Sequence, residues 1–307
     1  MLNWRTPELG DMDLVRKYME RDGAVSSDCA PANIYLLRDK YNIKIAEEGG
    51  FLYRKYTGEG LPGRDGITFP IGEGDIKKAV DAAIADRAEK GKPLKLIYLL
   101  EKQCDKLKAC GYDVNLQTER GNSDYLYTSD HLIRLSGRSN HKKKNRALRF
   151  EKMYPDSRLE FTDHFDAKFC NDLIYVEDKW FHDQEERIDS AFVERDEIYD
   201  ACRIWDELGL IGALVYSPDN RPVAMSIASK ISDGYYDIHF EKCYGDYARD
   251  GGFAYINRSF ARHLFETFGA EWINREEDIG LEGLRKAKMS YNPDLLLAKY
   301  HCVIENA

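Results

Sequence analysis

The segment IGALVYSPDNRPVAMSIASKISDGYYDIHFE, residues 211–241, decides the fold that we predict for this chain. It contains three runs rich in apolar and β-branched residues, which is the pattern of β-strands. Short turns separate the runs, Pro218-Asp219-Asn220 and Ser232-Asp233-Gly234, so that neighbouring strands run antiparallel. We therefore predict a three-stranded meander formed by residues 211–217, 223–231 and 235–241.

The elements around this meander occur in the same order in both halves of the chain. After the meander we predict a helix at 252–268, a strand at 271–274, a helix at 281–290 and a strand at 300–305. The first half has short β-like runs at 34–37, 43–46, 51–56 and 67–71. A helix that begins at Asp75 follows, and then a buried strand at 94–100. No residue-level repeat accompanies this match. We predict an α+β protein with two similar domains, residues 1–130 and 131–307, each a mixed, mostly antiparallel sheet flanked by helices.

The composition excludes several classes of protein. The 307 residues include 45 Lys and Arg and 54 Asp and Glu, a net charge of −9, which excludes a uniformly basic surface, and DNA is not an expected partner. No stretch approaches the roughly 18 apolar residues of a membrane span, and the N-terminus lacks a signal core. We therefore expect a cytoplasmic protein with no transmembrane segment. Seven scattered cysteines without a C-x-x-C pair indicate neither a disulfide framework nor a metal site.

The strongest local signal is the basic segment, Arg134–Arg149, which contains seven Lys or Arg residues and no acid. A helix that begins at Ser139 or Asn140 would place Leu148 and Met153 toward the core. Because uncompensated positive charge near a helix N-terminus is unfavourable, the segment favours anion binding over a solvated helix face. Arg and Lys suit phosphate groups, and the candidate phosphate ligands are Arg138, His141, Lys142, Lys143 and Arg146.

A second anion-binding pattern, R-x-x-G-x-A, lies between the meander and the helix at 252–268. Free backbone N–H groups and the helix dipole favour an anion at such a junction. The pattern is typical of coenzyme A binding, with Arg249, Gly252 and Ala254 as the contacts, although Asp246 and Asp250 in the same loop oppose an anion. Coenzyme A or acyl-coenzyme A is therefore one candidate cofactor, and a glycine-rich helix entry without a ligand is the alternative.

Polar side chains also follow the ends of two predicted strands. His239 and Glu241 alternate along one strand and share a face, and Asn274 and Glu276 do so at the end of the next strand. Adjacent strand ends converge on one cleft, so Glu241 and Glu276 are candidate bases that take a proton from an attacking amine or hydroxyl. The alternative for each carboxylate is a surface group or a helix cap.

Two stretches resemble a known family: Leu135–Arg138 with His141–Asn145, and Asn274–Lys288 with Ser290-Tyr291. Over nearly its whole length the chain resembles uncharacterised soluble proteins that share the C-terminal catalytic domain of phosphatidylglycerol lysyltransferases. The resemblance implies tandem GNAT-like (acyl-CoA N-acyltransferase) domains, as in Fem-type peptidyltransferases. It also implies transfer of an aminoacyl group from aminoacyl-tRNA to an amine or hydroxyl. Asn274, Arg285 and Tyr291 would then bind substrate, and Lys288 would assist an oxyanion or a phosphate.

Three functions follow from these signals. The leading hypothesis is an aminoacyl- or acyltransferase, whose basic segment contacts the acceptor end of aminoacyl-tRNA and whose acceptor is a small molecule, a peptide or a lipid head group. The first alternative is a coenzyme A-dependent N-acyltransferase that uses the loop at 249–254. The second is a non-catalytic RNA- or ligand-binding module. The loop favours coenzyme A, whereas the basic segment favours a larger polyanion.

Overall fold

The structure is a computed structural model that describes residues 1–57, 64–183 and 189–305. The chain divides into two compact units. Unit 1 contains Met1–Tyr125, Glu277–Arg285 and Leu296–Ala307, and unit 2 contains Leu126–Glu276 and Lys286–Leu295. The chain first passes from unit 1 to unit 2 after Tyr125, near the predicted boundary at residue 130. The division differs from the predicted one because two later segments belong to unit 1.

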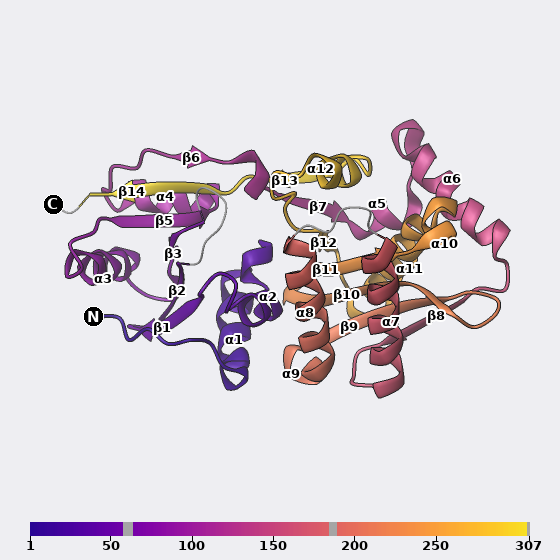
Figure 1. The fold of residues 1–307 in the computed structure, drawn as a ribbon. Coiled ribbons are helices and arrows are strands. Elements are labelled where there is room, and N and C mark those ends of the chain that lie inside the picture. Colours follow the sequence, from indigo (N-terminus) through magenta and orange to yellow (C-terminus); the bar gives the residue numbers. More distant parts are fainter. Residues whose placement is uncertain (58–63, 184–188, 306–307) are drawn as a thin grey trace. The chain divides into compact units, whose positions relative to one another are not determined.

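Unit 1 contains a mixed sheet with the strand order β1-β2-β3-β5-β14-β6, in which β4 also pairs with β2 (Figure 1). Only the pair β3–β5 is parallel, and the other pairs are antiparallel. The strands are β1 (Lys44–Glu48), β2 (Phe51–Tyr56), β3 (Gly66–Thr68), β4 (Ile71–Gly72), β5 (Leu94–Leu99), β6 (Gln117–Thr118) and β14 (Tyr300–Ile304).

The helices of unit 1 bury apolar side chains against this sheet. Val80 and Ala83 of one helix and Leu107 of another pack in one core with Leu96 and Leu99 of β5. The helical elements are η1 (Leu9–Asp11), α1 (Met12–Asp22), η2 (Ser27–Cys29), α2 (Pro31–Leu36), α3 (Ile76–Ala88), α4 (Glu101–Ala109) and η3 (Arg120–Asn122). The predicted strand at 34–37 is wrong, since these residues extend a helix that Pro31 begins with its preset φ.

Unit 2 contains the sheet that the meander predicts, in the order β13-β7-β12-β11-β10-β9-β8. The meander is confirmed, since β9, β10 and β11 pair antiparallel, and β11 pairs with β12 in parallel. The strands are β7 (Asp124–Thr128), β8 (Arg158–Thr162), β9 (Leu210–Tyr216), β10 (Pro222–Ser232), β11 (Tyr235–Cys243), β12 (Trp272–Asn274) and β13 (Leu295–Leu297).

Helices cover both faces of this second sheet. In Figure 1 α7 and α8 lie in front of the strands and α11 lies behind them, and α11 also packs against α5 and α6. The helices are α5 (Ser129–Arg134), α6 (Gly137–Met153), α7 (Ala167–Asp183), α8 (Asp189–Arg203), α9 (Trp205–Leu208), α10 (Gly245–Asp250), α11 (Gly252–Phe268) and α12 (Glu282–Met289), the last shared between the units. In the described parts of the chain, no helix is long and apolar enough to cross a membrane.

The helix α6 starts earlier than predicted and buries a different set of side chains. The helix begins at Gly137, earlier than predicted, and it buries Asn140, Ala147 and Phe150. Leu148 and Met153, predicted to face the core, are exposed. Residues three or four positions apart share a helix face, so the stripe that contains 140, 147 and 150 also includes residue 143.

Each sheet is completed by a strand from the other part of the sequence. In unit 1 the parallel pair β3–β5 is followed in the sheet by the C-terminal strand β14. In unit 2 the parallel pair β11–β12 is followed by β7, which begins at Asp124. A helix, α3 or α11, lies in the chain between the two parallel strands in each case. The two sheets therefore share one arrangement of strands. In each sheet the strand next to the parallel pair, β14 or β7, comes from the other half of the sequence.

A network of buried charges lies where the C-terminal strand begins in unit 1. The Nζ atom of Lys299 lies 2.6 Å from Asp124, 2.8 Å from Glu277 and 3.5 Å from Asp28. Burial lowers the pKa of Lys299, but the three carboxylates together raise it well above its usual value. With two arginines the network balances three positive and three negative side chains: Lys299, Arg54, Arg64, Asp28, Asp124 and Glu277.

We predict that Lys299→Met lowers the free energy of unfolding by about 3–5 kcal/mol, because it leaves the buried Asp124 carboxylate without its ammonium partner. Chemical denaturation measures this loss. The double variant Lys299→Met/Asp124→Asn should recover part of it, and Lys106→Met, at an exposed position of α4, is the control. A single variant as stable as the control, or a double variant no better than the single one, would contradict the prediction.

A second buried ionisable group lies in unit 2. The Glu177 side chain on α7 is fully buried, and neither carboxylate oxygen has a hydrogen-bond partner among the described residues. Burial raises the pKa of Glu177 to about 7, although the charge of Lys242 acts in the opposite direction. The folded state therefore binds this proton more tightly than the unfolded chain. This contribution to stability is complete below the unfolded pKa of about 4.5 and is lost as the pH rises to about 7.

We predict that Glu177→Gln stabilises the protein relative to wild type more at pH 8 than at pH 5. The pH-dependent part of the difference should approach about 3 kcal/mol, which corresponds to the pKa change from 4.5 to about 7. Denaturation curves across this pH range measure it. Glu266→Gln, at an exposed position of α11, is the matched control and should show no such dependence.

Candidate functional site

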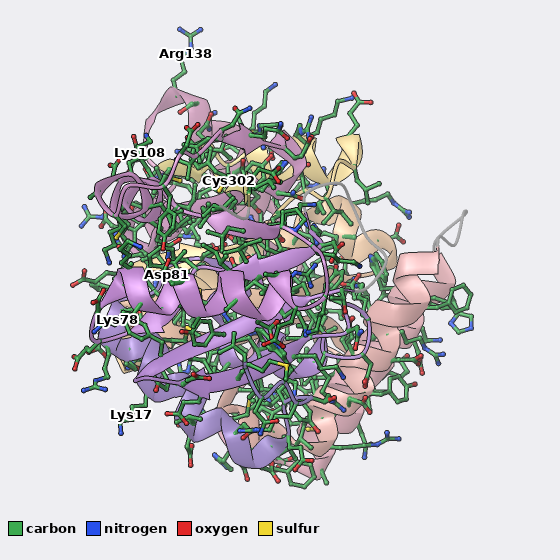
Figure 2. The ribbon with its side chains drawn as sticks, turned by 90° about the vertical axis from the view of Figure 1, so that its left-hand side faces the viewer. Lys17, Lys78, Asp81, Lys108, Arg138 and Cys302 are labelled. Carbon is green, nitrogen blue, oxygen red and sulfur yellow. The ribbon has the colours of Figure 1, made fainter. Side chains whose placement is uncertain are left out.

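The basic segment forms the first half of α6, and its side chains point in different directions. Arg138, His141, Lys142 and Arg146 are exposed, and Figure 2 shows Arg138 extending away from the ribbon. Lys143 lies on the buried stripe of the helix and is half-buried. Of these candidate phosphate ligands, Lys143 therefore extends furthest into the interior.

A cationic cluster in unit 2 surrounds Tyr291, and we define it as Lys143, Arg146 and Arg275. The Lys143 ammonium lies 4.1 Å from the centre of the buried Tyr291 ring, and the Arg275 guanidinium carbon lies 4.8 Å from it. Both distances are within the range of cation–π contacts. Arg275 also forms an ion pair with Glu241 at 3.0 Å, and the Asn257 amide donates a hydrogen bond to the same carboxylate at 2.8 Å.

The electrostatics of this cluster favour a bound anion. Burial, together with the charges of Arg275 and Arg146, lowers the pKa of Lys143 to about 8, while Glu241 raises it slightly. Three cations and one carboxylate leave a formal charge of +2. The Nη1 atom of Arg275 is buried and has no hydrogen-bond partner among the described residues. A buried donor without a partner is costly, so a phosphate or carboxylate group of a ligand would relieve both imbalances.

The two predicted bases have different surroundings. Glu241 is partly buried and is held by Arg275 and Asn257, so it offsets one of the three positive charges of the cluster. Glu276 is half-buried, with Oε1 3.6 Å from Nδ1 of His239. Its backbone has φ 56°, a left-handed conformation that is rare for Glu, and the Oδ1 atom of Asn274 accepts a hydrogen bond from its N–H at 2.8 Å. Glu276 is therefore the more accessible carboxylate of the two.

Three other predicted site residues have structural partners. Arg285 belongs to unit 1, where its guanidinium donates to both oxygens of Asp278, at 2.7 and 2.9 Å. Lys288 is buried, and its backbone carbonyl accepts a hydrogen bond from Tyr127 at 2.7 Å. Tyr291 supplies the ring of the cationic cluster.

The loop of the coenzyme A pattern packs tightly against other elements. A Cβ atom at Gly251, where φ is 113°, would lie 2.2 Å from the carbonyl oxygen of Arg146 on α6. One at Gly252 would lie 2.5 Å from the sulfur of Cys243. Arg249 is exposed and pairs with Asp246, and Ala254 is buried. Close packing of the start of α11 therefore accounts for both glycines without a ligand.

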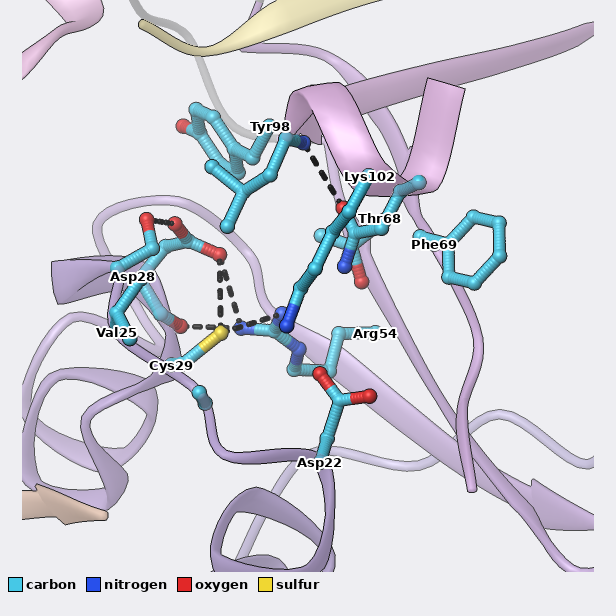
Figure 3. Close-up of a pocket in the computed structure, with 13 residues that line it drawn as sticks. Asp22, Val25, Asp28, Cys29, Arg54, Thr68, Phe69, Tyr98 and Lys102 are labelled. Carbon is cyan, nitrogen blue, oxygen red and sulfur yellow. Dashed lines mark hydrogen bonds and ion pairs between the residues drawn. The ribbon is translucent and has the colours of Figure 1, made fainter. Parts of the chain in front are cut away.

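A small pocket lies in unit 1 beside the buried charge network (Figure 3). The Nη2 atom of Arg54 donates a hydrogen bond to the Cys29 sulfur at 3.3 Å, and Arg54 also forms an ion pair with Asp28 at 3.2 Å. Burial raises the pKa of the Cys29 thiol to about 12, although Arg54 opposes this effect. The thiol is therefore protonated near neutral pH and is a poor nucleophile, since the thiolate is the reactive form. Tyr98 and Thr68 also line the pocket.

Comparison with known proteins shows the class of this fold. The sequence matches the family described as phosphatidylglycerol lysyltransferase, C-terminal, over residues 23–303. A conserved protein of unknown function from Bacteroides thetaiotaomicron is 26% identical with a TM-score of 0.88, and the match covers 99% of this chain and 100% of that one. L-PGS from Bacillus licheniformis is 14% identical, with a TM-score of 0.62 and coverages of 96% and 92%. The C-terminal domain of a protein assigned as a lysylphosphatidylglycerol synthetase in Agrobacterium fabrum is 15% identical, with a TM-score of 0.64 and the same coverages.

Two mixed sheets flanked by helices give the chain the fold of these neighbours, and the predicted fold class is confirmed. The chain belongs to the phosphatidylglycerol lysyltransferase C-terminal family. A comparison with curated proteins gives no match.

Sequence reasoning missed two residues that shape the candidate site. Arg275 follows a predicted strand directly, and no local pattern indicates that it turns toward Glu241. Asn257 had a detectable signal, because it is a polar residue on the buried stripe of α11, between Ala254 and Phe260. A buried amide generally has a hydrogen-bond partner, and here the partner is the Glu241 carboxylate.

We predict that Arg146→Gln raises the pKa of Lys143 above about 8, because it removes one of the two cations that lower it. Burial and Arg275 still act, so the pKa should stay below the usual lysine value. NMR titration of the Lys143 side chain in lysine-labelled protein measures the change. Lys152→Gln in the last turn of α6 is the control. A pKa of Lys143 that is already ordinary in wild type, or equal in the two variants, would refute the account.

Proposed function

We propose that this protein transfers an aminoacyl group from aminoacyl-tRNA to an amine or hydroxyl acceptor. The observation that carries the proposal is the cationic cluster of Lys143, Arg146 and Arg275 around Tyr291, with its formal excess of positive charge. A protein with a net charge of −9 repels polyanions over most of its surface, so such a cluster marks where one binds. Membership of the family and the L-PGS neighbour support the choice of donor.

The residues of unit 2 take distinct roles in this proposal. Lys143 and Arg146 bind a phosphate of the tRNA acceptor end, and the exposed Arg138, His141 and Lys142 extend this surface along α6. Arg275 binds an oxygen of the donor through its buried Nη1, and Glu241 holds the guanidinium in place. Glu276 accepts a hydrogen bond from the attacking amine or hydroxyl. The resulting positioning, together with hydrogen bonds to the developing oxyanion, supplies the acceleration.

The alternatives have less support in the geometry. The loop at 249–254 owes its glycines to packing, and Asp250 in that loop is bound by Arg149 at 2.6 Å and by Tyr154 at 2.8 Å. Coenzyme A therefore has no specific contact in its favour. A binding module without catalysis would use the same cationic cluster, and only a test for product formation separates it from a transferase.

The test supplies aminoacyl-tRNAs with a radiolabelled amino acid and follows the label into pools of amines, peptides or phosphatidylglycerol vesicles. Wild-type protein should form a labelled product with at least one acceptor pool. Lys143→Gln/Arg146→Gln should raise KM by about tenfold and reduce the slope of log affinity against log salt by about one for each lost phosphate contact.

The matched control, Lys152→Gln/Lys179→Gln, removes the same charge at exposed positions of α6 and α7. Its kinetics and salt slope should equal those of wild type. Tight binding of tRNA without labelled product would support the binding module instead. Absence of both binding and product in wild type, or equal losses in the two double variants, would refute the proposal.

A further inference from the structure

Three ligand-type side chains converge at the parallel pair of strands in unit 2. Asp237 and His239 alternate on β11 and so point to the same face. Asp237 pairs in register with Asn274 of the neighbouring β12, which places Glu276 just beyond the end of that strand. One oxygen of Asp237, one oxygen of Glu276 and Nδ1 of His239 all lie within 4.8 Å of one another.

The imidazole of His239 has one nitrogen that lacks a hydrogen bond. Its side chain is only 1% exposed, and within the described residues Nδ1 has no hydrogen-bond partner. Nδ1 lies 3.5 Å from Asp237 and 3.6 Å from Glu276, which is longer than a normal N–H···O hydrogen bond. The other nitrogen, Nε2, lies 2.8 Å from the hydroxyl of the buried Ser229. If Nε2 donates its proton to Ser229, the lone pair of Nδ1 points between the two carboxylates.

The spacing of these atoms distinguishes between two kinds of cation. Tetrahedral ligands about 2.1 Å from a metal ion lie about 3.4 Å from one another. Acceptors about 2.8 Å from an ammonium nitrogen would lie about 4.6 Å apart in the same geometry. The two separations from Nδ1 of His239, 3.5 and 3.6 Å, match the first arrangement and are too short for the second, and the two carboxylate oxygens lie within 4.8 Å of each other.

We propose that Asp237, His239 and Glu276 bind a divalent cation, for which Zn²⁺ is the best match. One neutral imidazole and two carboxylates carry a charge of −2, which the ion neutralises. Imidazole favours zinc over magnesium or calcium, and three protein ligands leave a fourth position open. Asp237 is fully buried, whereas 27% of the Glu276 side chain is exposed, so that the side of the site formed by Glu276 is accessible.

Neighbouring groups hold the three ligands in place. Ser229 contacts the second nitrogen of the histidine, as outer-shell partners of metal-bound histidines do. The hydrogen bond from the Glu276 N–H to Asn274 supports the left-handed backbone of Glu276. The sequence indicated no metal site, because the ligands come from two strands that only the parallel pairing brings together. This inference does not depend on the proposed function, and a metal-bound Glu276 keeps a second carboxylate oxygen that can accept a hydrogen bond.

The experiment measures metal binding directly, without activity. The full chain is freed of metal with a chelator and titrated with Zn²⁺ by calorimetry, and metal content is measured after dialysis. Wild type should bind one ion per chain with micromolar or tighter affinity, and the melting temperature should rise with Zn²⁺. Glu276→Gln should weaken binding by at least about tenfold. His239→Asn should abolish the added ion while both variants remain folded by circular dichroism.

Asp233→Asn, in the exposed turn between β10 and β11, is the matched control and should bind Zn²⁺ as wild type does. Because cysteines also bind zinc, Co²⁺ serves as a second probe, whose absorption spectrum separates nitrogen and oxygen ligands from thiolates. Wild type that binds less than about one fifth of an equivalent would overturn the proposal. So would equal binding by wild type and His239→Asn, or a spectrum dominated by thiolate ligands. If either ligand variant fails to fold, the spectrum of Co²⁺ bound to wild type decides.

Discussion

The ammonium group of Lys299 is the point on which the arrangement of the chain depends. A buried lysine requires carboxylates, and its three partners come from segments far apart in the sequence: Asp28 in η2, Asp124 at the start of β7 and Glu277 after β12. Lys299 also precedes β14, and its carbonyl accepts a hydrogen bond from Thr118 at 2.9 Å. The ion network can form only if the C-terminal segment returns to unit 1. The charges therefore select the exchanged strand pairing over one in which each half of the sequence keeps its own last strand.

Local patterns predicted elements well and predicted their partners poorly. The meander and the helix Gly252–Phe268 were correct, because alternation, turn residues and a terminal glycine are all written within a few residues. The assignment of β14 to unit 1 was not predictable, since any apolar strand can satisfy an edge and the ion network joins residues 28 to 299. The same reason applies within the candidate site. The basic segment was identified, but which of its cations reaches the interior depends on the rotation of α6 about its axis. That rotation was predicted from Leu148, which is exposed in the structure.

Two adjacent residues separate the positive and negative parts of unit 2. Arg275 turns to Tyr291 and Glu241, whereas Glu276 turns to His239 and carries a left-handed backbone. Because strained backbone persists only where surrounding contacts determine it, the hydrogen bond from Glu276 to Asn274 is part of the cause. The result is a cationic cluster that suits phosphates and an acidic cluster that suits a cation, both built from the end of β12.

The packing of α11 against α6 connects these features to the fold. Gly251 has a left-handed conformation and lies so close to the carbonyl of Arg146 that any side chain would collide with it. That contact sets how closely α6 packs against the start of α11. Residue 143 lies on the buried stripe of α6 and therefore faces Tyr291. A larger residue at 251 would push α6 outward and withdraw both Lys143 and Arg146 from the cluster. The glycine-rich loop thus affects the cationic cluster indirectly, by setting the distance between two helices, so a sequence that matches a cofactor pattern here has a packing role.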